Sequence, residues 1–112
     1  MARPTLPIPT PAETRAMNFL HKQGSATVRE YLEKGDHSKT PAYTSVMSLL
    51  MVMHEKGLAT RKEEGRAFRY TPALSQAEMR SAVVANVLEN VFAGDLDAFK
   101  AAVAAAKSGK KR

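Results

Sequence analysis

Cysteine is absent from the 112-residue chain, and aromatic residues make up only 6% of it. Disulfides and thiolate metal sites are therefore excluded, and a reducing cytoplasm is the natural setting. No apolar run approaches the roughly 18 residues of a membrane span. The start, residues 1–9, also lacks the continuous apolar core of a secretory signal. We therefore expect a cytoplasmic protein that does not insert into a membrane.

Signatures of catalysis and of cofactor binding are missing as well. His21, His37 and His54 are scattered, and none has a second metal ligand at helical spacing. The chain contains no glycine-rich phosphate loop. We find no arrangement of residues that would activate a nucleophile. These absences predict a protein that is not an enzyme and that uses neither a metal nor a cofactor.

Negative charge is the scarcer sign in this chain. Lysine and arginine total 17 against 11 acidic residues, which gives a formal net charge of +6. This balance favours a polyanionic partner, although the excess is mild and spread along the chain. Hydrophobic residues make up 44% of the sequence, which is enough for a thin core that a second copy could complete.

The predicted elements divide the chain into four segments. They are a proline-rich arm over residues 1–9, a winged helix-turn-helix domain over 10–74, a helical dimerisation region over 75–107 and a basic tail over 108–112. The fold class is mainly α with a small β-hairpin. Proline at the density found in the arm resists helix formation and keeps the chain extended.

Capping boxes mark the starts of three predicted helices, since a hydroxyl residue is followed three positions later by glutamate. The pairs are Thr10 with Glu13, Thr27 with Glu30, and Ser75 with Glu78. We predict helices over about 11–23, 28–34 and 76–92, with a short extended link at Ser25 and Ala26. A last helix, capped by Asp95 or Asp97, should run to about residue 106.

Between the second and the last two helices, the sequence predicts a long helix followed by a hairpin. The helix runs from about Pro41 to Lys56, and Gly57 is placed to terminate it. Residues 58–62 and 67–70 read as two strands, joined by a turn at 63–65 whose glycine can adopt a positive φ. A helix followed by a short basic hairpin is typical of a winged helix, which can place the helix in the DNA major groove.

One face of the long helix has the composition expected for DNA contact. Its buried stripe consists of Val46, Leu49, Leu50 and Met53 at the spacing i, i+3, i+4, i+7. The opposite face carries short hydroxyl side chains, which can bond phosphates or base edges. A cation just ahead of the helix adds to the positive helix end. The predicted contact residues here are Lys39, Thr40, Tyr43, Thr44, Ser45 and Ser48.

Other interpretations of this face remain open. Hydroxyl residues are common on solvated surfaces, so an ordinary exposed face is one alternative. Met47, Met51 and Val52 could belong to the core, contact thymine methyl groups or bind another protein. The second candidate function is therefore a winged-helix protein-protein interaction module without specific DNA binding.

The hairpin is basic, and arginine can hold a phosphate through two bonds. Glu63 and Glu64 argue against deep insertion of the predicted tip, because phosphates repel them. We therefore predict phosphate contacts at Arg66 and Arg69. The competing interpretation is that these positions merely face water.

The helices after residue 75 predict a homodimer. Their apolar residues cover too wide an arc for a helix that rests on a single neighbour, so a second copy is the economical partner. The alternative is that both helices fold back on the first domain. The predicted dimerisation residues are Met79, Val83, Val84, Val87, Leu88, Val91, Phe92, Leu96, Phe99 and Val103.

Several segments together resemble the penicillinase-repressor family, the BlaI/MecI/CopY group of bacterial regulators. The similarity runs from Thr10 to about Gly94. It is carried by residues 10–13, 26–30, 42–48, 55–58 and 65–70, in that order and spacing. The resemblance implies a homodimeric winged-helix repressor that binds an inverted-repeat DNA operator.

The resemblance also implies a release mechanism, either proteolysis triggered by a membrane sensor or metal binding. The sequence supports neither. The copper-responsive branch uses C-terminal cysteines, which are absent here, and the cleaved branch is cut at an Asn-Phe bond, whereas Asn90 precedes Val91. Relatives often carry threonine and arginine where this chain has Met51 and Val52, so one expected phosphate contact also lacks support.

Overall fold

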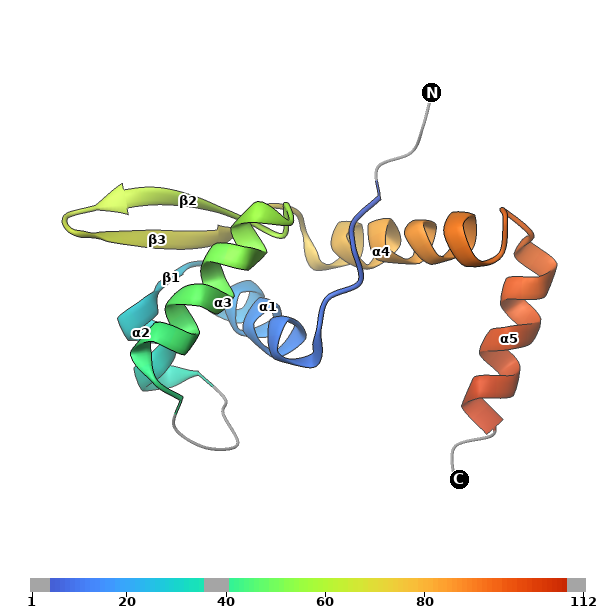
Figure 1. The fold of residues 1–112 in the computed structure, drawn as a ribbon, viewed down its shortest axis with the longest axis horizontal. Helices are drawn as coiled ribbons and strands as arrows, with labels where there is room; N and C mark the ends of the chain where they lie inside the picture. The colour runs from blue at the N-terminus through green and yellow to red at the C-terminus, as the bar shows by residue number, and fades with distance from the viewer. Residues whose placement is uncertain (1–4, 36–40, 109–112) are drawn as a thin grey trace.

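The computed structural model describes residues 5–35 and 41–108. The molecule is elongated, with extents of 49 × 40 × 21 Å. A winged-helix unit lies at one end, α4 (Gln76–Val91) leads away from it, and α5 (Leu96–Ser108) turns off at the far end (Figure 1). None of the helices in the described ranges is long and apolar enough to cross a membrane.

The first two helices begin where the capping boxes predict. α1 spans Pro11–Gln23 and α2 spans Val28–Lys34. In each box the threonine hydroxyl accepts from the glutamate backbone N–H and the carboxylate accepts from the threonine N–H. Two of the backbone donors that every helix start leaves unpaired are satisfied in this way.

α3 spans Tyr43–Glu55, slightly shorter than predicted, and Gly57 follows its C-cap with φ of 83°. α4 spans Gln76–Val91 behind the confirmed Ser75 capping box, and α5 spans Leu96–Ser108. The backbone N–H of Ala98 donates to the Asp95 carboxylate over 3.0 Å, so Asp95 rather than Asp97 caps the last helix. Ser108 belongs to α5, and the rest of the predicted tail lies outside the described residues.

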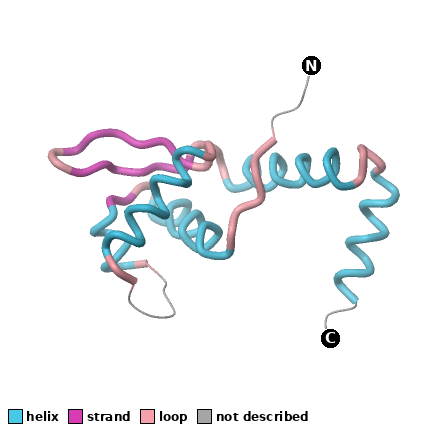
Figure 2. Tube along the Cα trace, in the orientation of Figure 1, coloured by secondary structure: helices cyan, strands magenta, loops and turns pink. Residues whose placement is uncertain are grey.

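The sheet has one more strand than the sequence predicts. β1 (Ala26–Thr27) pairs with β3 (Ala67–Pro72), which also pairs with β2 (Ala59–Glu64). The order is β1-β3-β2 and all pairs are antiparallel. Figure 2 shows the long hairpin projecting beyond the helices at one end of the molecule.

The hairpin turn begins two residues later than the sequence predicts. β2 continues through Glu64, and Glu63 and Glu64 pair with Phe68 and Ala67. The turn consists of Gly65, whose φ is 64°, and Arg66. Arg66 therefore lies at the tip of the hairpin, and the two glutamates lie in the strand behind it.

A single core holds the winged-helix unit together. The largest side chains with almost no exposure are Tyr70, Met17, Leu20, Leu50, Met53, Leu58 and Val46, contributed by α1, α3, β3 and the α3–β2 link. Because Val46, Leu50 and Met53 come from α3, the core fixes which face of that helix points outward.

The N-terminal arm joins this unit to α4. The backbone N–H of Leu6 donates to the Ala82 carbonyl over 3.2 Å, and the Asn86 side-chain amide donates to the Leu6 carbonyl over 2.8 Å. The Leu6 side chain packs against the core. Leu6 is followed by Pro7, which has no backbone N–H. Leu6 therefore supplies a backbone donor that Pro7 cannot.

Candidate nucleic-acid interface

The outer face of α3 carries the predicted hydroxyl groups. Thr44, Ser45 and Ser48 are exposed, as is Tyr43 at the start of the helix. The buried stripe of Val46, Leu50 and Met53 holds this face away from the core, with Leu49 partly buried beside it. The structure thus orients these hydroxyls toward the surroundings, as the helical spacing predicts.

The start of α3 has no side-chain cap within the part of the chain that the structure describes. Its N-cap residue is Ala42, whose methyl side chain makes no capping hydrogen bond. The first N–H groups of the helix therefore lack the side-chain acceptor that α1, α2 and α4 have. An uncapped helix start favours anions, including phosphate. Lys39 and Thr40, predicted to contact DNA just ahead of this point, lie outside the described residues.

The structure removes one of the three readings of the large apolar residues on α3. Met47, Met51 and Val52 are 38%, 39% and 37% exposed, so they do not belong to the core. They share the outer half of the helix with Thr44 and Ser48. The face is consequently mixed, with flexible thioethers beside small hydroxyls, and suits contact with both methyl and polar groups.

One of the two phosphate contacts predicted on the hairpin is exposed. Arg66 is exposed at the tip and Lys62 is exposed on β2. The Arg61 guanidinium instead lies over the Phe68 ring, 4.1 Å from its centroid. Arg61 is thereby stacked along the hairpin, whereas Arg66 projects into the surroundings.

Arg69 is not available as a phosphate ligand in this structure. Its Nε donates to Glu64 over 2.8 Å, and Nη2 donates to Glu64 over 2.9 Å and to Glu30 over 3.0 Å. Its Nη1 donates to Glu30 over 3.0 Å and to the Ser25 hydroxyl over 3.1 Å. An arginine side chain has five N–H donors, and all are used here. The sequence-based prediction for Arg69 missed these partners for two reasons. Glu30 is distant from Arg69 along the chain, and Glu64 was predicted to lie in a turn.

The protonation states follow from this cluster. Hydrogen bonds from Arg69, joined for Glu30 by the Thr27 backbone N–H, hold the pKa of Glu30 and of Glu64 below the usual glutamate range. The same bonds to Glu64 and Glu30 raise the pKa of Arg69. All three groups are therefore charged at neutral pH.

A second surface lies on α4 and α5. Val84, Val91, Leu96 and Val103 are exposed, and Val83, Val87 and Leu88 are partly buried. Phe92 and Phe99 contact each other edge to face across the α4–α5 turn, with ring centroids 5.4 Å apart. Exposed large apolar side chains grouped on two consecutive helices are typical of a protein-protein interface.

Met79 differs from the other predicted dimerisation residues. It is only 6% exposed and packs in the core of its own chain, and Ala82 and Ala85 on the same face of α4 are buried as well. The wide apolar arc of α4 is thus two surfaces, one covered within the chain and one left exposed. Met79 belongs to the first and is corrected to a core residue.

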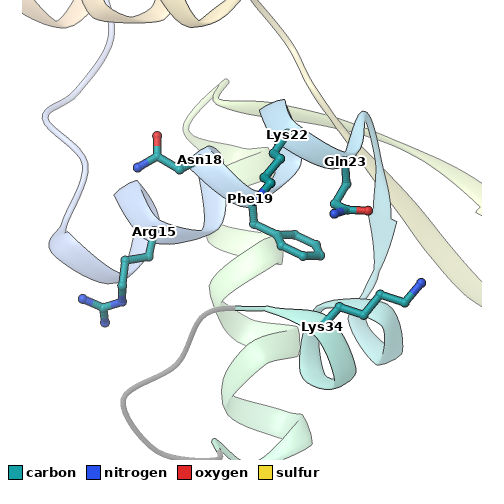
Figure 3. A pocket seen from close by; sticks show the side chains of 6 residues that line it. All are labelled: Arg15, Asn18, Phe19, Lys22, Gln23 and Lys34. Atoms are coloured by element: carbon teal, nitrogen blue, oxygen red, sulfur yellow. The ribbon is translucent and has the colours of Figure 1, made fainter.

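An open hollow of about 250 Å³ lies on α1 and the end of α2. Its lining residues are Arg15, Asn18, Phe19, Lys22, Gln23 and Lys34. Figure 3 shows these side chains on α1 and at the end of α2. Among the described residues, no group of histidine and acidic side chains could hold a metal ion.

The chain has relatives in a known protein family. The sequence profile of the family described as "Penicillinase repressor" matches residues 9–111, which is most of the chain. The chain belongs to the penicillinase repressor family. Its relatives include "Transcriptional regulator BlaI" from two strains of Mycobacterium tuberculosis, CDC 1551 and H37Rv. Each is 32% identical over 100 residues, covering 74% of this chain and 72% of the relative.

Solved structures of BlaI have the same fold as this penicillinase repressor family member. The solution structure of the DNA-binding domain of the repressor BlaI matches with a TM-score of 0.58 and 24% identity, over 68% of this chain and 93% of that one. Bacillus licheniformis BlaI in its monomeric form, in complex with the blaP half-operator, matches with a TM-score of 0.55 over the same shares and at the same identity. The winged helix expected from the sequence is thereby confirmed.

Family membership also answers the question of catalysis. Penicillinase repressors are transcriptional regulators and not enzymes. Sequence reasoning missed the long-range contacts of this family member, including those of Glu13 with Lys56, Glu30 with Arg69, and Asn86 with Leu6. The capping boxes identified the two glutamates but not their distant partners, since a local motif carries no information about a contact across the fold.

Proposed function

We propose that this protein is a transcriptional repressor that binds double-stranded DNA as a homodimer, reads an inverted-repeat operator with α3 and holds the backbone with the tip of the hairpin. The observation that carries the proposal is the outer face of α3. It presents three exposed hydroxyl side chains beside a helix start without a side-chain cap, and Arg66 is exposed at the tip of the hairpin. We place the protein in the cytoplasm, where its DNA partner would lie.

Several further observations support this proposal. The net charge is +6, which favours binding to a polyanion. The family consists of repressors, and the Bacillus licheniformis relative of this fold was solved with a half-operator. The exposed apolar surface of α4 and α5 would unite two copies, so that two recognition helices face two half-sites.

The operator can be obtained by selecting bound duplexes from random DNA, and the test is then made with the selected duplex. Ser45→Ala, Ser48→Ala and Thr44→Ala should leave the fold intact because these side chains are exposed. A direct base contact contributes roughly 1–3 kcal/mol of discrimination. We therefore expect at least one of the three variants to lose preference for the selected duplex over random DNA, as measured by competition binding.

The three substitutions can also give contrary results. A parallel loss of affinity for both DNAs in every variant would mean that α3 positions the protein and that sequence is read through DNA shape. No change in any variant would favour the second candidate function, in which Met47, Met51 and Val52 contact a protein. Salt separates the two functions, because counterion release makes DNA binding weaken steeply with salt and an apolar contact lacks this dependence.

Arg66→Ala should weaken binding to all DNA sequences alike. Arg66 is exposed at the hairpin tip, and the acidic residue nearest to it along the chain, Glu64, is bonded to Arg69. Loss of one phosphate contact should lower the slope of log affinity against log salt by about one unit. Titrations at several salt concentrations measure this slope, with Arg15→Ala on α1, another exposed arginine, as a matched control. Equal slopes for wild type and Arg66→Ala would show that Arg66 does not contact the backbone.

A further inference from the structure

The outer part of the hairpin has little packing to hold it. Tyr70 is buried in β3, but Glu64, Gly65, Arg66 and Ala67 are exposed. β1 pairs with β3 only at Tyr70 and Arg69, so the sheet beyond that point is a two-stranded ribbon. A two-stranded ribbon is marginally stable alone. Its orientation therefore depends on whatever side-chain contacts join it to the rest of the domain.

Phe68 on β3 packs against the edge of the core, and Arg69 adds a polar connection. The partners of Arg69 are the Ser25 hydroxyl ahead of β1, the Glu30 carboxylate in the first turn of α2 and the Glu64 carboxylate at the end of β2. Glu30 is itself fixed, because its Oε1 accepts from the Thr27 backbone N–H over 3.2 Å. One planar guanidinium thus joins the hairpin to the start of α2 through bidentate bonds to two carboxylates, the geometry for which arginine is best suited.

We propose, on the basis of the proposed DNA-binding function, that Arg69 is a positioning residue: it clasps Glu30 and Glu64 and so holds the hairpin tip with Arg66 at a fixed orientation to α3, without touching DNA itself. The clasp has a second effect. Glu64 lies two residues from Arg66 and its charge would repel phosphates, and pairing with Arg69 offsets that charge.

The alternative is that Arg69 leaves the glutamates and binds a phosphate. A double-mutant cycle on affinity for the selected duplex distinguishes the two, with the variants Arg69→Gln and Glu30→Gln and their combination. Glutamine at position 30 keeps the capping box, since glutamine also serves there. Glu33→Gln on α2 changes the charge equally and has an exposed side chain, so it measures the general electrostatic gain from removing an acid.

The clasp predicts strong coupling. We expect Arg69→Gln and Glu30→Gln each to weaken binding by roughly fivefold to tenfold, and the double variant to bind no worse than the weaker single variant, because contacting residues that act as a unit are non-additive. Glu33→Gln should bind as well as wild type or better. Arg69→Lys, which keeps the charge but cannot form the bidentate pattern, should not restore affinity.

A direct phosphate contact gives the opposite pattern and would overturn the proposal. Glu30→Gln would then leave binding unchanged or tighter, Arg69→Gln would retain its full effect in the Glu30→Gln background, and Arg69→Lys would restore most of the affinity. NMR gives an independent readout: the Nε–Hε signal of Arg69 should keep its chemical shift when the duplex is added, whereas that of Arg66 should move. Wild-type protein that binds no duplex would refute the DNA-binding function, whereas wild-type binding with additive effects would refute the clasp alone.

Discussion

Val84→Asp combined with Val91→Asp is expected to convert the protein to a monomer that retains a folded winged-helix unit. Val84, Val87, Leu88 and Val91 follow the spacing i, i+3, i+4, i+7 along α4, on the face opposite the buried Met79. Val84 and Val91 are 43% and 68% exposed in the single chain. Aspartate at either position therefore disturbs little in the monomer, but it would be an unpaired buried charge in a dimer.

The expected loss of DNA affinity is large. A dimer binds two half-sites through one linked event, and such linkage raises affinity by about 100-fold or more over a single site. Light scattering measures the oligomeric state, and titration with the full operator and with a half-operator measures the binding. The double variant should lose affinity for the full operator while its affinity for the half-operator is unchanged.

Thr14→Asp on α1 is the matched control, since Thr14 is exposed and lies outside α4 and α5. It should dimerise normally. If the wild-type chain is already monomeric at micromolar concentrations, the exposed stripe is not a dimer interface, and a different partner must cover it. If the double variant with Val84→Asp and Val91→Asp remains dimeric, the interface lies on α5 instead.

Local signals in the sequence were sufficient to predict where the helices begin. Thr10, Thr27 and Ser75 each cap a helix through a glutamate three residues ahead, so the whole interaction lies inside one turn. The outward face of α3 was predictable for a similar reason. Its buried stripe repeats with the helical period, and burial of one face determines the other.

Features that depend on distant neighbours were missed. β1 consists of Ala26 and Thr27, which have no periodic pattern and form a strand only because β3 lies beside them. Glu63 and Glu64 next to glycine resemble a turn, but Glu64 stays in the strand, where Arg69 across the hairpin neutralises it. A pattern within a few residues cannot reveal a partner supplied by the folded chain.

Helix α4 contains features of both kinds, those that follow from a local pattern and those that depend on distant neighbours. One side of the apolar arc of α4 is buried within the chain, and the other side is exposed. The sequence alone could not assign each residue to a covering surface, because the N-terminal arm that bonds to Ala82 and Asn86 is distant along the chain. Met79 was consequently assigned to the wrong surface.

Lys56→Ala is expected to lower the free energy of unfolding by about 3 kcal/mol, the lower end of the range for breaking a buried ion pair. The Lys56 Nζ lies 3.0 and 2.9 Å from the two carboxylate oxygens of Glu13. The Glu13 side chain is 4% exposed and that of Lys56 is 29% exposed. Removing the lysine leaves a carboxylate buried without its cation, and the partial exposure of Lys56 moderates the effect. Urea denaturation followed by circular dichroism measures it.

A second substitution separates the ion pair from simple loss of packing. Glu13→Gln keeps the capping box of α1 but removes the buried charge, so adding it to Lys56→Ala should recover most of the lost stability. Lys22→Ala, which removes an exposed lysine from α1, is the control and should change stability by less than about 0.5 kcal/mol. If Lys56→Ala is no more destabilising than Lys22→Ala, the ion pair does not hold the start of α1 against the end of α3. Helix α3 carries the proposed recognition face. A loss of stability in Lys56→Ala should therefore also loosen that helix and weaken DNA binding, although neither residue of the pair lies on the outer face of α3.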